Sequence, residues 1–376
     1  MRDLRKLISI AIILVIIVVS ISYYYTHRKH FLPIASLING RTPGIVSITD
    51  FGARCDGKTD DTQAFKDAIA SGYPVYIPPG TTVIDQTIVL PAKRPVFIYG
   101  TGRGVSKILV NSTIEDLFYK DDENVFGSAF RDFSVYGNNR VKRIFDLTTY
   151  TGAELANLYL TDYLVSAIRM GGGNNLCNIN SLHDLYIRQY GIGLGAINIR
   201  PDYGIEMNTN AVDNMFDRIF IATVKTAGII DNAGGNNYSD VHIWGYPDTP
   251  NYRPQYGIIT NNGRILISQC YLDSIAVAGV RVNGPFVSVE GCQFLWPHAD
   301  PTSVGVEIGD GVDNVVVADN IARKLTAPAL VRFLGTIGHN VFVDDNSSYD
   351  NGVTEIQNRY IKPEGNHINS LTAEDT

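Results

Sequence analysis

Carboxylate, imidazole and guanidinium groups recur at matching places in a short repeated phrase of this sequence. His183 and Asp184 stand in one copy of the phrase, Asp217 and Arg218 in the next, and Asp240 in the one after. A carboxylic acid and a carboxylate about 5–10 Å apart can hydrolyse a glycosidic bond, and an arginine or histidine can serve as the base of a β-elimination. The candidate catalytic residues are therefore Asp184, Asp217, Asp240, His183, Arg188 and Arg218.

The repeated phrase reads apolar, any residue, Asp- or Asn-like, apolar, any residue, apolar. Leu182–Ile187 is the clearest copy, Phe130–Val135 is the first, and looser copies contain Asp319 and Asp345. Successive copies lie about 27 residues apart, a period typical of solenoids, in which each turn buries its apolar face against its neighbours. The sequence therefore predicts stacked coils.

A second phrase, glycine followed by isoleucine or valine, runs in step with the first from Gly204-Ile205 to Gly305-Val306. An asparagine follows most of these glycines four residues later, as at Asn208 and Asn232. Asparagine and aspartate tolerate the left-handed backbone of a corner, whereas apolar spacing of three and four, which a helix requires, is missing. We predict an all-β protein, a parallel β-helix.

Equivalent residues on successive coils of a β-helix stack about 4.8 Å apart. Asp184 and Asp240 would then lie two coils apart with Arg218 between them, and Asp217 would lie one coil from His183. The alternative is structural, because an aspartate at a corner usually bonds the local backbone. Calcium held by these aspartates would assist a lyase, and no other cofactor or metal is predicted.

The outward fifth position of the phrase carries a ring in five consecutive copies, so the rings would form one column. Such a column could stack against the apolar faces of sugar rings, or a loop, the linker or a second copy could cover it. Two loops, at 245–255 and 296–303, follow the same strand phrase and would wall a groove beside the column. The predicted substrate-binding residues are Tyr159, Tyr186, Phe220, His242, Tyr271, Trp244, Arg253 and Trp296.

The segment Asp50–Phe65 reads D-F-G-A-R-C-D-G-K-T-D-D-T-Q-A-F, and Pro74–Gly80 follows as P-V-Y-I-P-P-G. We expect Asp60 or Asp61 to cap a short helix, with Gln63 reaching back to the cap. This opening resembles that of the pectate-lyase superfamily, in its rhamnogalacturonase/epimerase-like branch. The resemblance implies a right-handed parallel β-helix with a short N-terminal capping helix, acting on acidic or O-antigen-like polysaccharide.

Both ends of the chain differ in character from the repeats. Residues 1–30 hold basic residues around the apolar run Leu7–Val19 and predict a signal anchor or a signal peptide. Residues 31–44 are predicted as a linker, 45–350 as the β-helix and 351–376 as a polar tail. The anchor would attach the protein to a membrane, and a cleaved signal would secrete it. We expect no large trimerisation segment after the solenoid, which speaks against a phage tailspike.

Net charge, cysteines and missing motifs exclude some partners and activities. The formal net charge is −7 over 376 residues, so nucleic acid is not an expected partner. Cys270 and Cys292 fall at the same inward position on adjacent coils and are predicted to be free thiols, and Cys55 and Cys177 also look unpaired. A family-28 polygalacturonase carries several motifs in a fixed order, and this sequence does not show that order. Gly338-His339-Asn340 is the nearest match to the Gly-His-Gly motif.

Two functions remain open from the sequence. The first is a polysaccharide lyase or glycoside hydrolase outside the cytoplasm that uses the face around His183 and Asp240. The second is a non-catalytic glycan-binding or cell-envelope protein that keeps only the solenoid and its column of rings.

Overall fold

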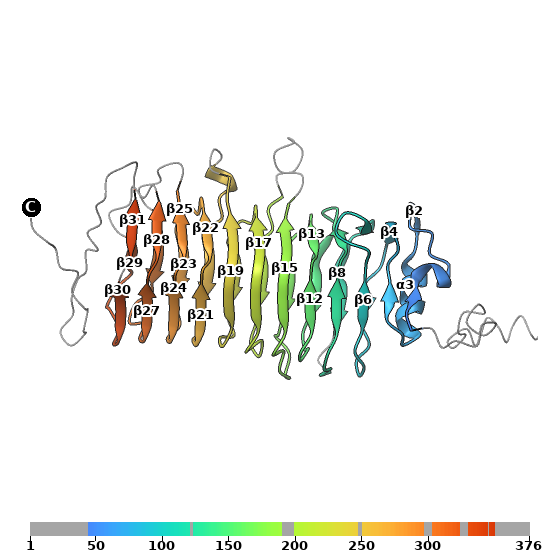
Figure 1. Cartoon of the computed structure of the whole chain (residues 1–376), viewed down its shortest axis with the longest axis horizontal. Coiled ribbons are helices and arrows are strands. Elements are labelled where there is room, and N and C mark those ends of the chain that lie inside the picture. Colours follow the sequence, from blue (N-terminus) through green and yellow to red (C-terminus); the bar gives the residue numbers. More distant parts are fainter. Residues whose placement is uncertain are drawn as a thin grey trace, which may run out of the picture.

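The coils of the protein stack side by side along one long axis (Figure 1). The computed structural model describes residues 44–120, 123–189, 199–246, 250–296, 303–323, 330–344 and 346–349. Its strands form a 21-stranded and a 10-stranded sheet, in which each strand pairs in parallel with the equivalent strand of the next coil. The predicted fold class is confirmed.

The larger sheet carries the repeated phrase. Its strands are β1 (Val46–Ser47), β2 (Asp56–Asp60), β3 (Val75–Tyr76), β4 (Gly80–Ile84), β6 (Phe97–Tyr99), β7 (Ser106–Val110), β9 (Ala129–Arg131), β10 (Ser134–Tyr136), β12 (Glu154–Ala156), β13 (Tyr159–Thr161), β15 (Ser181–Arg188), β17 (Met215–Ala222), β19 (Asn237–Trp244), β21 (Ile265–Ser268), β22 (Tyr271–Asp273), β24 (Val287–Glu290), β25 (Gln293–Leu295), β27 (Val315–Ala318), β28 (Ile321–Arg323), β30 (Val341–Asp344) and β31 (Ser347–Tyr349).

The smaller sheet carries the glycine phrase. Its strands are β5 (Ile88–Val89), β8 (Ile114–Lys120), β11 (Val141–Leu147), β14 (Ser166–Met170), β16 (Tyr203–Met207), β18 (Ala227–Asp231), β20 (Tyr256–Thr260), β23 (Ala278–Val282), β26 (Val304–Ile308) and β29 (Val331–Phe333). Among the described residues, three short helices accompany the two sheets, namely η2 (Ile48–Phe51), α3 (Thr62–Ala70) and η3 (Pro250–Tyr252).

A left-handed residue bends each described copy of the phrase at its third position. The backbone φ there lies between +49° and +67°, a region that aspartate and asparagine enter more readily than most residues. The bend leaves the first, fourth and sixth positions facing the core and the second and fifth facing outward, as the burial of Leu182–Ile187 shows. The bent residues are Asp132, Asn157, Asp184, Arg218, Asp240, Gln269, Gly291 and Asp319.

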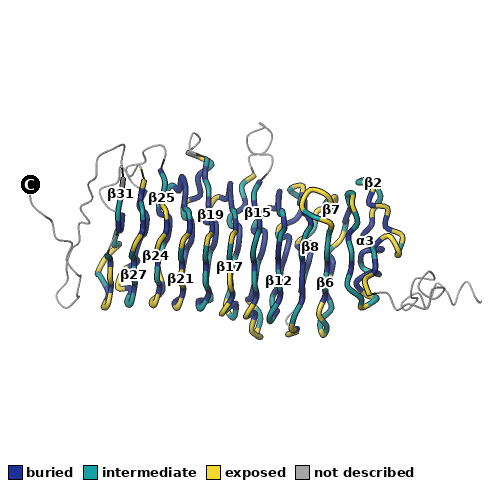
Figure 2. The backbone as a smooth tube through the Cα atoms, in the orientation of Figure 1, coloured by how far each residue is buried: buried dark blue, intermediate teal, exposed yellow. Residues whose placement is uncertain are grey.

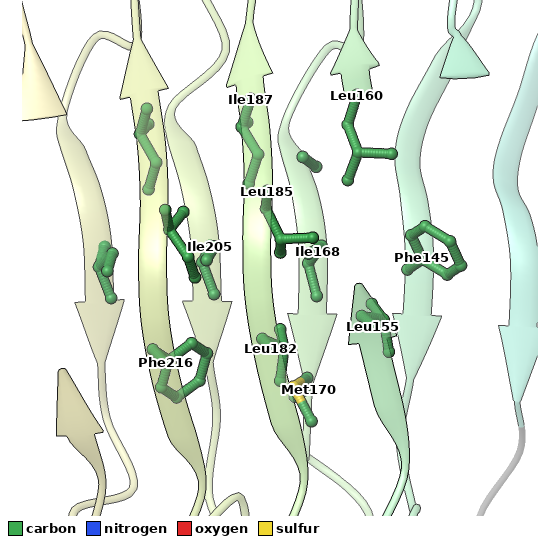
Figure 3. Packing of buried hydrophobic residues seen from close by; sticks show 14 of the residues in the cluster. Phe145, Leu155, Leu160, Ile168, Met170, Leu182, Leu185, Ile187, Ile205 and Phe216 are labelled. Carbon is green, nitrogen blue, oxygen red and sulfur yellow. The ribbon is translucent and has the colours of Figure 1, made fainter. Parts of the chain in front are cut away.

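The inward positions build one continuous apolar core between the two sheets (Figure 3). Leu182, Leu185 and Ile187 from β15 meet Ile168 and Ile205 from the opposite sheet, and all are buried. Burying a side chain of this size contributes about 1.5–3 kcal/mol. Buried residues accordingly run along the inside of every coil, with exposed residues mostly at the turns (Figure 2).

The predicted capping helix, α3, lies at the N-terminal end of the solenoid (Figure 1). It buries Phe65, whose ring centroid lies 6.0 Å from that of Phe118. Asp61 stands at the N-cap without a side-chain capping bond, because its carboxylate accepts from two backbone N–H groups of the preceding turn. Asp60 accepts from the backbone N–H of Thr62 instead, at 2.9 Å. The expectation that Gln63 reaches back is wrong, since its amide donates to Asp67.

All four cysteines are buried free thiols, as predicted. Cys270 and Cys292 stack on adjacent coils, and a hydrogen bond with Cys292 together with burial raises the pKa of the Cys270 thiol. The predicted anchor or signal at 1–30, nearly all of the linker and the 351–376 tail lie outside the described residues. Within the described part of the chain, no helix is long and apolar enough to cross a bilayer.

Candidate functional site

Five rings form a single column on the outer face of the larger sheet. The strand register pairs Tyr159 with Tyr186, Tyr186 with Phe220, Phe220 with His242, and His242 with Tyr271. The predicted alignment is confirmed, and we call these five residues the aromatic column. All five side chains are half-buried, so each keeps part of its surface open to a ligand.

The rings of the aromatic column touch in sequence. Tyr159 and Tyr186 stack with centroids 5.3 Å apart, and Tyr186 and Phe220 stack at 4.5 Å. His242 then meets Phe220 edge-on at 5.0 Å and Tyr271 at 4.5 Å. Burial raises the pKa of Tyr159 to about 12 and lowers that of His242. At neutral pH the column is therefore an uncharged surface.

Further rings lie next to the aromatic column, one at its Tyr159 end and two along one side. Tyr136 lies 5.8 Å from Tyr159, and Trp244 lies 6.5 Å from Phe220 and 4.6 Å from Tyr246. Trp244 was predicted as a binding residue, and it stands beside the column as expected. Tyr136 was missed because it occupies the seventh position rather than the fifth, although both positions face outward.

The loop after β19 is held in place by an arginine from another coil. The guanidinium of Arg200 donates to the backbone oxygen of Arg253 at 2.8 Å and to those of Val224 and Asn251. It also lies 5.9 Å from the ring of Tyr252. These bonds hold the backbone of residues 251–253 in place. The Arg253 side chain is only 9% exposed. Arg253 therefore supports the loop from inside, which corrects its predicted place on the binding surface.

The prediction that Trp296 lies on the binding surface is also wrong. Its side chain is 2% exposed and stacks on Phe294 in the core, with its indole N–H donating to the carbonyl of Ile275 at 3.2 Å. An indole buried in this way is not available to a ligand. Residues 297–302, which follow it, lie outside the described part of the chain.

A network of charged side chains runs beside the aromatic column. Arg218 donates to both carboxylate oxygens of Asp184 at 2.9 Å and also pairs with Asp217. His183 Nδ1 contacts Asp184 at 2.7 Å, and His183 Nε2 contacts Glu154 at 3.2 Å. We call these five residues the charged cluster. The strand register places His183 directly beside Asp217, as predicted.

The charged cluster holds Asp184 in its ionised form. Hydrogen bonds from Arg218 and then from His183 keep the pKa of the Asp184 carboxyl well below its usual range, and Asp184 raises the pKa of Arg218 in turn. Asp184 therefore cannot supply a proton near neutral pH. Its two oxygens are already engaged with the guanidinium, and this does not favour the predicted role as a calcium ligand.

Two residues of the network were not predicted. Glu154 accepts from His183 and from Arg131, at 3.3 Å for the latter, and Arg131 also pairs with Asp132 at 3.0 Å. Glu154 stands just before the repeated phrase of its coil. The columns were predicted from positions within the phrase, so they did not include Glu154. An outward side chain two residues before the second position is the signal that would have found it.

A pocket of about 390 Å³ opens at the charged cluster. Asp240 is exposed on the next coil and acts on Arg218 only through its charge. Arg188 lies apart from the carboxylates, because its guanidinium contacts the Tyr186 hydroxyl at 3.3 Å and the Gln189 carbonyl. Within the described residues, no three or more His, Cys, Asp or Glu side chains converge to hold a metal ion. The pocket is lined by Ser181, His183, Met215, Phe216, Asp217, Arg218, Asn237 and Ser239.

Parallel coils and a capping helix define the class of protein, a parallel β-helix. Residues 45–148 match the family described as rhamnogalacturonase A/epimerase, pectate lyase-like. The resemblance recognised from the opening motif is therefore confirmed over these residues.

The sequence is also similar to phage appendage proteins. The pre-neck appendage protein of Bacillus phage B103 is 25% identical over 309 residues, which are 81% of this chain and 29% of that protein. The preneck appendage protein of Bacillus phage PZA is 38% identical over 101 residues, 25% of this chain and 12% of that protein. The chain thus spans less than a third of these relatives. With so small a share of them covered, the expectation about tailspikes stays a prediction.

Solved structures share the fold at low sequence identity. ORF18 of Geobacillus virus E2 superposes with a TM-score of 0.62 at 16% identity, covering 82% of this chain and 62% of that one. The A-module of the mannuronan C-5 epimerase AlgE6 of Azotobacter vinelandii gives 0.57 at 13%, covering 82% and 96%. Tailspike protein 2 of the Escherichia coli O157:H7 bacteriophage CAB120 gives 0.56 at 13%, covering 81% and 43%. These likenesses concern the fold alone.

Proposed function

We propose that this protein binds a polysaccharide along the aromatic column, outside the cytoplasm or on a virus particle. The observation that carries the proposal is the column itself, five half-buried rings in register on consecutive coils. Sugar rings present apolar C–H faces that stack on aromatic side chains. Four steps of about 4.8 Å make a platform about 19 Å long, which suits an extended chain of several sugars.

The similar proteins support this setting. One fold neighbour is named for its action on mannuronan, a polysaccharide, and others are a tailspike and phage appendage proteins. An N-terminal anchor at residues 1–30 would place the β-helix outside a cytoplasmic membrane, and it stays a separate proposal that cell fractionation of the full chain tests.

The direct test removes rings from the column. A panel of mannuronan, homogalacturonan, rhamnogalacturonan and cell-wall polysaccharide of Bacillus is immobilised, and retention of the protein is measured. For a retained glycan, Tyr186→Ala and Phe220→Ala should each weaken binding about tenfold, because losing a stacked ring removes roughly 1–2 kcal/mol.

The matched control is Tyr119→Ala, which removes a half-buried ring from the outer face of the smaller sheet. Its binding should equal that of the wild type. Equal losses in all three variants, or retention that Tyr186→Ala and Phe220→Ala leave unchanged, would remove the aromatic column as the binding surface.

A second candidate function is glycan cleavage at the charged cluster, favoured by the pocket that brings His183 and Asp217 together. Elimination would need a base for the C5 proton while the C4–oxygen bond breaks and the leaving sugar gains a proton. Hydrolysis is less well served, since Asp184 stays ionised. Ultraviolet absorbance of an unsaturated product, or new reducing ends, that Asp217→Asn and His183→Ala abolish would establish this activity.

A further inference from the structure

One loop of the larger sheet crosses onto the outer face of the next coil. It comprises residues 100–105, between β6 and β7, and we call it the stop loop. The backbone N–H of Gly102 donates to the carbonyl of Asp132 at 2.7 Å, and that of Gly104 donates to the Ser134 hydroxyl at 3.0 Å. Ser134 is fully buried as a result, although its position faces outward. The loop stands exposed beside β7 (Figure 2).

The base of the stop loop fits closely against that coil. A Cβ added to Gly100 would come within 2.2 Å of the Asp132 carbonyl oxygen and 2.9 Å of the Phe133 Cβ. Only a residue without a side chain allows the backbone this close an approach. Gly100 therefore allows the stop loop to pack closely against the coil that contains Asp132.

The tip of the stop loop reaches further still. The guanidinium of Arg103 lies 3.4 Å from the backbone oxygen of Asp184 on β15, across the coils of β10 and β13. Asp184 belongs to the charged cluster, so the tip ends at that cluster. The loop thus spans one end of the outer face from the aromatic column to the charged cluster.

At the stop loop the fifth-position rings give way to residues without a ring, and Tyr136, at the seventh position of β10, is the ring next to Tyr159 on that side. In the fifth-position column the residue before Tyr159 is Ser134, and the ones before it are Lys107 and Thr81, which carry no ring. At the other end the column passes from Tyr271 to Gln293, whose side chain is exposed. The stop loop therefore covers the fifth position at one end of the platform, above a buried serine, whereas Gln293 at the other end is exposed.

We infer that the aromatic column receives the end of a glycan chain, with the terminal sugar against the stop loop and the rest of the chain running toward Gln293. This inference rests on the proposed function and adds the mode of recognition to it. A chain lying across an open platform could be bound anywhere along its length. A chain that meets a wall at Ser134 is bound only at a terminus, once per chain.

Stoichiometry distinguishes the two modes. Short, medium and long size fractions of each panel glycan are titrated with the full chain, and bound protein is counted per glycan chain by analytical ultracentrifugation. End recognition predicts one protein per chain in every fraction, because a linear chain has one terminus of each kind. Bound protein that rises in proportion to chain length would overturn the inference while leaving the proposed function intact. Failure to bind any fraction of any glycan would count against both.

Two variants test whether the stop loop is what limits binding to the chain end. Arg103→Ala removes the long contact at the tip, and Gly100→Ala forces the base away from Asp132. Each should let bound protein begin to rise with chain length. The control is Arg140→Ala, an exposed arginine that also donates to one backbone carbonyl, that of Asn111. If both loop variants still bind once per chain, as Arg140→Ala should, the stop loop does not set the end and the inference is wrong.

Discussion

Arg218 is the residue on which the charged cluster depends. It occupies a left-handed corner that most copies of the phrase give to aspartate or asparagine, with a φ of 49°. From there its guanidinium joins Asp184 of the previous coil to Asp217 on its own strand. Arg218 thus holds the carboxylates of Asp184 and Asp217, which would otherwise repel each other, beside one pocket. The same bonds make the cluster stable and make Asp184 a poor acid.

The ion pair of Asp184 predicts a pH dependence of stability. Because the folded-state pKa of Asp184 is lowered, the pair stabilises the protein above the unfolded pKa of about 4 and loses this effect as the pH falls through the folded value. Asp184→Asn should therefore lower the free energy of unfolding at pH 7, modestly because the side chains are 40% and 51% exposed. The difference from wild type should shrink toward pH 2. Urea titrations at both pH values measure it.

Asp240→Asn is the matched control for this experiment. Asp240 occupies the same left-handed column, with a φ of 54°, and asparagine adopts that backbone equally well. We expect little change at either pH. A loss for Asp184→Asn that stayed constant with pH would show that the ion pair is not its cause.

At the scale of the strands and corners, two asparagine ladders join neighbouring coils. The inner ladder links Asn180 to Asn214 at 2.9 Å and Asn214 to Asn236 at 3.1 Å, and all three are buried. The outer ladder links Asn283 to Asn261 and Asn261 to Asn232, both at 2.7 Å. The bonds are alike, but water can replace only those of the outer ladder.

The two ladders should therefore respond differently to the same substitution. Asn214→Ala should lower the free energy of unfolding by about 2–4 kcal/mol, since it leaves several buried donors and acceptors without partners. Asn261→Ala should lower it by less than about 0.5 kcal/mol at an exposed site. Chemical denaturation of both variants measures the difference, and equal losses would contradict this account of the ladders.

The strand register could be predicted from sequence because it depends on spacing alone. Once Tyr159, Tyr186 and Tyr271 recur at one position of a repeated phrase, stacking aligns them without further information. Side chains in the connections carry no such constraint. Trp296 follows a strand and was predicted on the surface, yet its packing on Phe294 decides its place. The stop loop escaped notice for the same reason, since its contacts join residues up to 81 positions apart.

Over the whole molecule, each coil is stabilised mainly by its two neighbours. The first coil has only one neighbour, and α3 takes the place of the other by burying Phe65 against the core. The end of the solenoid therefore depends on a helix of nine residues.

Removing that contact should loosen the solenoid from one end. Phe65→Ala should cost about 3–5 kcal/mol, as expected for a buried aromatic ring. In hydrogen exchange the amides of β1 to β4 should lose protection first, while those of β17 to β23 keep theirs. Phe126→Ala is the control, since that ring is 74% exposed. Uniform loss of protection along the chain would contradict the local role of α3.

The most direct test of the aromatic column as a glycan platform is a diffraction structure of the protein with an oligosaccharide from a retained glycan. We predict sugar rings stacked over Tyr186 and Phe220 and running along the column toward Tyr271. An oligosaccharide bound at another face, with these three rings untouched, would contradict the account.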